Sequence, residues 1–159
     1  MVPSRQRRAI HTIEVSIKSG PAQPPALVGS APSVIYAEWE AARSLLDVRV
    51  LAYVIMPDHI HIVLWATSGA NVRAFLQRTL SLTARSLQSG RRFWKERPSV
   101  VAVYSEQVLK VKVDYVHGNP VRAGLAQTPA DWLHSSYRQL EQGESSGVFT
   151  CDGWDGLLR

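Results

Sequence analysis

The chain has 159 residues, of which 45% are apolar and 19% charged, so it can bury one compact core and does not have the composition of a disordered chain. Its net charge of +5 permits a polyanionic partner. A single cysteine, Cys151, excludes a disulfide framework and a cysteine zinc cage, and no apolar run is long enough to span a membrane. We therefore expect a cytoplasmic protein with no membrane partner.

The first part of the chain predicts alternating strands and helices. β-Branched residues that alternate with polar ones indicate strands, and a continuous apolar run indicates a buried strand. The predicted elements are a strand over Ala9–Lys18, a Pro/Ser-rich loop over 19–33, a helix over Val34–Leu46, a buried strand over Val48–Met56, a turn at Pro57-Asp58 and a strand over His59–Ala66.

Residues 71–88 form the clearest predicted helix. Apolar residues recur on one arc at 100° per residue, and Arg73, Arg78 and Arg85 fall on the opposite arc. This arc is either a solvated face or a face that lies along a phosphate backbone.

A basic loop and two further elements follow this helix. Phe93 and Trp94 stand among basic residues, where they either stack on unpaired bases or fill the core. Residues 99–104 indicate a strand. Residues 106–118 are ambiguous, because valines that alternate with period two favour a strand on pattern alone, before Gly118 and Pro120 break the element.

The order β-α-β-β-α-β matches an α+β, ferredoxin-like sandwich, with an antiparallel sheet and helices on one face. We expect a single domain over residues 1–140. Residues 141–159 form a mildly acidic C-terminal tail.

Met56-Pro57-Asp58-His59-Ile60-His61 is the best local signal of chemistry. Side chains alternate along a strand, so His59 and His61 share one face and can ligate one metal ion. The alternative is a pair of partly buried histidines with hydrogen-bond partners. A third ligand must come from elsewhere, and an oxygen ligand beside histidine nitrogens suits Mg²⁺ or Mn²⁺. The candidates are Asp58, Asp114, His117 and Asn119.

A second motif runs from Tyr115 to Leu125 and reads Tyr-Val-His-Gly-Asn-Pro-Val-Arg-Ala-Gly-Leu. Together with the histidine motif it resembles the HUH single-tyrosine transposases, most of all the branch associated with repetitive extragenic palindromes (REP). The segment Asp131–Tyr137 resembles that branch's Trp-x-Ser-Ser-Tyr segment. The resemblance covers about Val48 to Tyr137 and implies an HUH endonuclease-type fold.

The resemblance implies residue roles where the motifs match. His59, His61 and Asn119 correspond to the metal ligands, and Tyr115 corresponds to the nucleophile. The disputed segment is then a helix that Pro120 ends, with Tyr115 and Asn119 on one face. The implied activity is cleavage and rejoining of single-stranded or hairpin DNA through a 5′-phosphotyrosine intermediate.

Further DNA contacts are expected from basic and aromatic residues, and Arg122 either contacts DNA or caps its helix. The predicted DNA-binding residues are Arg73, Arg78, Arg85, Arg91, Arg92, Phe93, Trp94, Lys95 and Arg122. One alternative is a protein of the same fold that binds DNA hairpins without cutting them, and another is a metal-dependent hydrolase. Either a monomer or a homodimer is compatible with the sequence.

Overall fold

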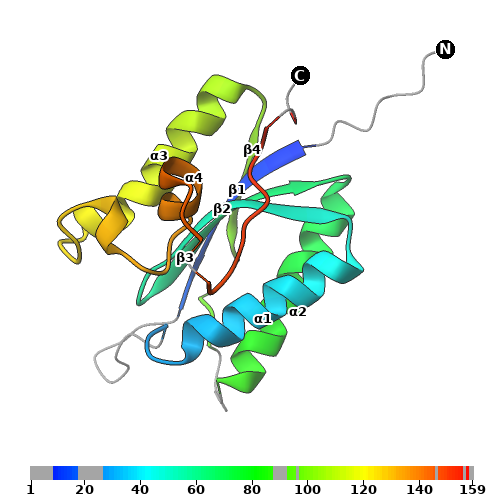
Figure 1. Ribbon diagram of the computed structural model, residues 1–159. Coiled ribbons are helices and arrows are strands. Elements are labelled where there is room, and N and C mark those ends of the chain that lie inside the picture. The colour runs from blue at the N-terminus through cyan, green and yellow to red at the C-terminus, as the bar shows by residue number, and fades with distance from the viewer. Residues whose placement is uncertain are drawn as a thin grey trace.

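The computed structural model describes residues 9–17, 27–87, 93–95, 97–145, 147–155 and 157. Its centre is a four-stranded antiparallel sheet in the order β2-β3-β1-β4 (Figure 1). The strands are β1 (Ala9–Ser16), β2 (Val48–Ile55), β3 (His59–Ala66) and β4 (Ser99–Val103). This arrangement confirms the α+β, ferredoxin-like fold class.

One face of the sheet is covered by α1 (Ala31–Leu45) and α2 (Gly69–Ser86), which pack against each other (Figure 1). The predicted apolar arc of α2 faces the core, and α1 buries Ile35, Trp39 and Ala42 there. An aromatic cluster lies at the centre of this core, with ring centroids 5.3 to 5.9 Å apart. Its members are Tyr36, Trp39, Tyr53 and Phe149.

The opposite face is covered by α3 (Glu106–Arg122), so helices lie on both faces of the sheet and not on one face as predicted (Figure 1). The strand that the valine alternation favours for this segment is wrong, and the helix that the resemblance implies is right. Leu109, Val113 and Val116 are buried at helical spacing, whereas Val108 and Val111 are exposed. Burial of this helical face against the sheet therefore outweighs the β-propensity of valine and determines the helical conformation.

Pro120 lies inside α3, so the prediction that it ends the helix is wrong. Proline removes one backbone donor, and this close to the C-terminus only one helical hydrogen bond depends on it. The helix ends instead at Arg122, and Gly124 follows the cap residue Ala123 with a φ of +73°. The amides of Gly124 and Leu125 donate to the carbonyls of Val121 and Pro120, which is a Schellman C-cap.

The chain after α3 returns to the edge of the sheet at β2. It contains the 3₁₀ turn η1 (Pro129–Asp131) and α4 (Tyr137–Gln142). Between them, Ser135 forms a β-bridge with Val54, and the His134 carbonyl accepts from the Ile55 amide at 2.9 Å. Phe149 and Cys151 are buried in the core, so part of the predicted tail packs with the domain. In the described part of the chain, no helix is both long and apolar enough to cross a membrane.

Candidate active site

Strand β3 divides its side chains between core and site. Ile60 and Ile62 point into the core beneath α1 and α2. His59 and His61 point to the opposite face, as the alternation predicts, and their ring centroids lie 5.0 Å apart. The structure therefore brings the histidine pair together.

The carboxylate of Asp58 lies beside His59. Its Oδ1 is 2.7 Å from Nδ1 of His59. A carboxylate on one ring nitrogen fixes the tautomer and the ring orientation, and it directs the other nitrogen, Nε2, to a metal ion. Asp58 is therefore placed to orient His59 rather than to ligate through that oxygen.

Glu14 is a site residue that the sequence analysis did not identify. It lies directly opposite His61 in the pairing of β1 with β3, and its Oε2 is 4.0 Å from His61 Nδ1. The carboxylate adds negative charge beside the histidine pair. The strand register was the signal that could have found it, and that register joins residues far apart in the sequence.

His61 is held in its neutral form. Burial, then the nearby charges of His59 and Arg122, lower its pKa to about 4. Neutral imidazole is the form that ligates metals. Two imidazoles on one face, with the carboxylates of Asp58 and Glu14 nearby, are compatible with binding of a divalent cation. Among the described residues, histidine, cysteine and carboxylate groups alone form no complete cluster of three, so an amide or water ligand is required.

Tyr115 extends from α3 towards the histidines. Its ring centroid is 6.0 Å from that of His61, the two rings meet edge to face, and the residue is 53% exposed. Asn119 follows one turn later and is buried, with Nδ2 3.4 Å from the Tyr115 carbonyl. That contact uses the amide nitrogen, so it does not compete with ligation through Oδ1.

Arg122 completes this group of side chains. Its guanidinium carbon lies 4.0 Å from the centroid of the Tyr115 ring, and its Nη2 donates to the Tyr115 carbonyl. The side chain folds back along the helix to Tyr115, and its contact with DNA stays a prediction.

A cleft of about 260 Å³ opens beside Tyr115, between α3 and the strands β1, β3 and β4. His61 and Lys112 are among the residues that line it. The remaining lining residues are Thr12, Ile13, Glu14, Ile62, Ser99, Val101 and Val116. Tyr115 lines this cleft and is exposed, so its side chain can be reached from solvent.

Two of the candidate third ligands make contacts of their own. His117 is buried with Nε2 2.8 Å from Ser136 Oγ, and burial lowers its pKa to about 4. Asp114 is exposed and 3.9 Å from Lys110. Asp114 thus forms a surface pair along α3, and His117 joins α3 to the segment at the β2 edge.

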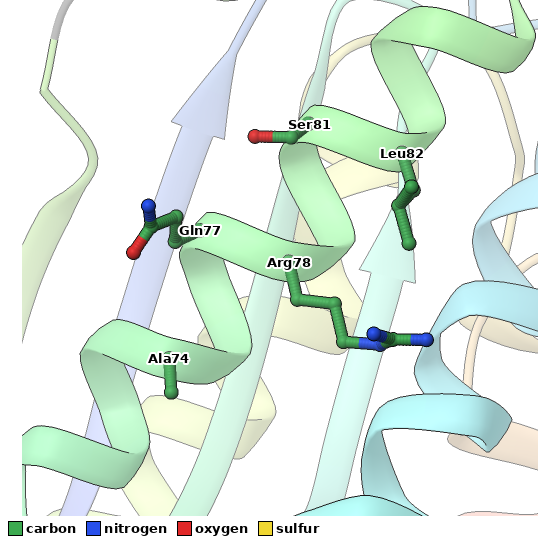
Figure 2. A pocket seen from close by; sticks show the side chains of 5 residues that line it. All are labelled: Ala74, Gln77, Arg78, Ser81 and Leu82. Carbon is green, nitrogen blue, oxygen red and sulfur yellow. The ribbon is translucent and has the colours of Figure 1, made fainter.

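The α2 arginines lie across the sheet from the histidine pair. Arg73, Arg78 and Arg85 are exposed on the outer side of α2. Residues along α2 line a shallow surface pocket. Figure 2 shows Gln77 and Ser81 on one side of the helix and Arg78 on the other. The structure does not bring these arginines to Tyr115, and their contact with DNA stays a prediction.

Phe93 and Trp94 are half-buried against the core. The Trp94 indole donates to the Leu80 carbonyl at 2.8 Å, which agrees with the core-filling alternative. Lys95 is exposed. Arg91 and Arg92 lie outside the described residues.

Comparisons with known proteins agree with the motif resemblance. No protein-family model matches the chain. A Haemophilus influenzae protein named "Putative REP-associated tyrosine transposase" is 25% identical over 105 residues, which cover 57% of this chain and 60% of that protein. The match thus spans less than two thirds of the relative.

A solved structure of a REP-associated tyrosine transposase bound to a REP hairpin shares the fold. Its TM-score is 0.75 at 16% sequence identity, over 91% of this chain and 87% of that chain. The similarity to REP-associated tyrosine transposases therefore extends from the two motifs to the sequence and to the fold.

Proposed function

We propose that this protein is a metal-dependent transposase of single-stranded DNA, which cleaves and rejoins strands through a covalent bond to Tyr115. The observation that carries the proposal is the convergence of His59, His61 and Tyr115 on one face of the sheet, with ring centroids 5.0 and 6.0 Å apart.

His59, His61 and Asn119 would hold Mg²⁺ or Mn²⁺. A bound divalent cation polarises a phosphate and offsets the negative charge that develops on its oxygens. Asp58 orients His59, and burial keeps His61 neutral so that it can act as a ligand.

The Tyr115 oxygen attacks the scissile phosphorus in line with the leaving oxygen. A phosphorus–oxygen bond to Tyr115 forms, the bond to the 3′ oxygen breaks, the phenol loses its proton and the 3′ oxygen gains one. The downstream strand then stays on the protein by its 5′ phosphate. A second 3′-hydroxyl can reverse the step without ATP, because the phosphotyrosine bond retains the phosphodiester.

Unpaired or hairpin DNA is the proposed substrate. The solved relative is bound to a REP hairpin, and the cleft beside Tyr115 opens to solvent. The basic side chains of α2, on the opposite face of the sheet, and Lys95 are proposed to contact phosphates of DNA that extends beyond the cleft. Arg91 and Arg92 are also proposed to contact DNA phosphates.

The test is covalent capture with two end-labelled copies of one hairpin oligonucleotide from the flanks of the gene. In Mn²⁺ or Mg²⁺, we expect 3′-labelled DNA to migrate with the denatured protein and 5′-labelled DNA to be released as a shorter strand. Tyr115→Phe should abolish the adduct. The matched control is Tyr104→Phe, since Tyr104 is 74% exposed outside the site, and this variant should form the adduct normally.

The outcomes separate the competing functions. Hairpin binding without any adduct over several flanking substrates would favour a protein that binds hairpins but does not cut them. Cleavage that survives Tyr115→Phe would favour hydrolysis by a metal-activated water.

A further inference from the structure

Three residues of the second motif lie on one face of α3. At 100° per residue, Arg122 lies about 20° from Tyr115 around the helix and Gly118 about 60° from it. Arg122 reaches this position only because the helix continues past Pro120. The spacing Tyr115, Gly118, Arg122 therefore forms a continuous strip along the helix.

Gly118 leaves the space that Arg122 occupies. A Cβ atom at residue 118 would lie 2.5 Å from Nη1 of Arg122, which is too close for both to stay in place. The backbone of Gly118 is ordinary helix, so no unusual φ calls for glycine. Glycine inside a helix costs about 1 kcal/mol relative to alanine. The space that the Arg122 guanidinium needs explains why glycine occurs at position 118.

Arg122 brings an uncompensated positive charge to the nucleophile. Its guanidinium stacks on the Tyr115 ring at 4.0 Å from the centroid. None of the described carboxylates forms an ion pair with it. The Tyr115 ring on which it stacks lies 6.0 Å from the His61 ring, so the charge of Arg122 is close to the histidine pair.

A stacked guanidinium keeps donors at its edges, and arginine matches the geometry of phosphate oxygens. We propose that Arg122, lying across Gly118, binds a non-bridging oxygen of the scissile phosphate while it holds the Tyr115 ring in position. The inference rests on the proposed function and adds a catalytic residue and the glycine that makes room for it.

A double-mutant cycle tests this arrangement. Arg122→Ala should slow adduct formation at saturating DNA by about 100-fold, as does removal of one preorganised donor to a transition-state oxygen. Gly118→Ala should slow it by about 10-fold or more and leave thermal stability equal or higher, since alanine favours helix. The double variant should be no slower than Arg122→Ala alone, because alanine at 118 then has nothing left to displace.

The chain supplies matched controls. Arg49 also stacks on an aromatic ring, with its guanidinium carbon 4.9 Å from the Trp65 centroid, so Arg49→Ala removes a stacked arginine outside the site. Gly69→Ala adds a Cβ in a helix with only an ordinary contact at 3.7 Å. Both controls should keep the wild-type rate.

Two further readouts do not depend on cleavage. In Tyr115→Phe, which cannot form the bond, Arg122→Ala should weaken binding of single-stranded DNA and reduce the slope of log K against log salt by about 0.7. In NMR spectra without DNA, the Arg122 side-chain protons should be shifted upfield by the Tyr115 ring, and Gly118→Ala should remove that shift.

The results distinguish failure of the inference from failure of the proposed function. Wild-type cleavage with Gly118→Ala at the wild-type rate, or losses that multiply in the double variant, would overturn the inference and leave the transposase proposal intact. A wild-type protein that forms no adduct but keeps the upfield shift and the Arg122-dependent salt slope would overturn the transposase proposal and retain Arg122 as a phosphate contact. An unchanged salt slope would reject the phosphate contact itself.

Discussion

Alternate side chains of the same strands have different roles on the two faces of the sheet. Beneath α1 and α2, alternate residues of β3 pack with an aromatic cluster in which the Tyr36 and Phe149 rings stack at 5.4 Å. On the α3 face, the intervening residues His59 and His61 meet Tyr115 beside an open cleft. Both faces bury apolar residues, but the α3 face also carries the polar groups of the candidate site. Substitutions of those polar groups and of the aromatic cluster should therefore separate activity from stability.

The largest expected effect is on the α3 face. His59→Ala should reduce adduct formation by about 1000-fold or more, because it removes a proposed metal ligand, while the free energy of unfolding changes by less than about 1 kcal/mol. His59 is partly exposed and its partner Asp58 is mostly exposed, so little burial is lost. Single-turnover cleavage and urea unfolding in EDTA measure the two effects. A large loss of stability would break the proposed separation of the faces.

The converse is expected on the other face. Phe149→Ala should lower the free energy of unfolding by about 3 to 4 kcal/mol, because Phe149 is buried in the aromatic cluster. The fraction that remains folded at low temperature should still form the adduct. Val148→Ala is the control, since Val148 is 41% exposed and should change unfolding little. Equal stability of the two variants would show that this part of the chain does not contribute to the core in solution.

Metal binding should stabilise the folded protein through the histidine pair. At a Mn²⁺ concentration 100 times its Kd, the free energy of unfolding should rise by about 2.7 kcal/mol, measured as an increase in Tm. His59→Ala should lose most of this increase. A rise of equal size in both proteins would place the cation elsewhere.

Acid should weaken the junction between α3 and the β2 edge. The pKa of His117 is about 4 in the folded state and about 6.5 when unfolded, so the unfolded chain binds the additional proton between these values. Its contribution is therefore complete above pH 6.5 and is lost as pH falls towards 4, by an amount on the order of 2 kcal/mol.

His117→Gln tests this effect, because glutamine can still bond to Ser136 but does not titrate. Urea unfolding in EDTA at pH 7.5 and 4.5 should show a smaller loss in the variant than in the wild type. His61 contributes a loss in the same direction to both proteins, so the difference between them isolates His117. An identical loss would assign the acid sensitivity elsewhere.

Local pattern predicted the strands and the first two helices because their periodicities agree with the faces they bury. It failed at α3, where Val111 and Val113 alternate with lysines but only Val113 is buried. Either conformation fits such a run, and contact with β2 and β3 selects the helix. The motif resemblance succeeded there because it carries tertiary information that a local window lacks.

The site was also predictable where it depends on local pattern and not where it depends on contacts between distant residues. The alternation of β3 placed both histidines on one face. Glu14 could not be found in this way, since its position beside His61 depends on the pairing of two distant strands. Arg122 was assigned to DNA contact or to capping of the helix end, and Pro120 was expected to end α3 before it. Its position over Tyr115 follows only once the Schellman cap at Gly124 is known.

The segment that pairs with the outer side of β2 has a consequence for synthesis of the protein. An unpaired strand edge invites association with other chains. Residues 134–136 bond to Tyr53 and Ile55, but they leave the ribosome some 80 residues after that strand. Until then the edge of β2 is unpaired in the nascent sheet, and His117 of α3 lacks its hydrogen-bond partner Ser136. Residues 134–136 thus cover the β2 edge and anchor α3 in the same late step of synthesis.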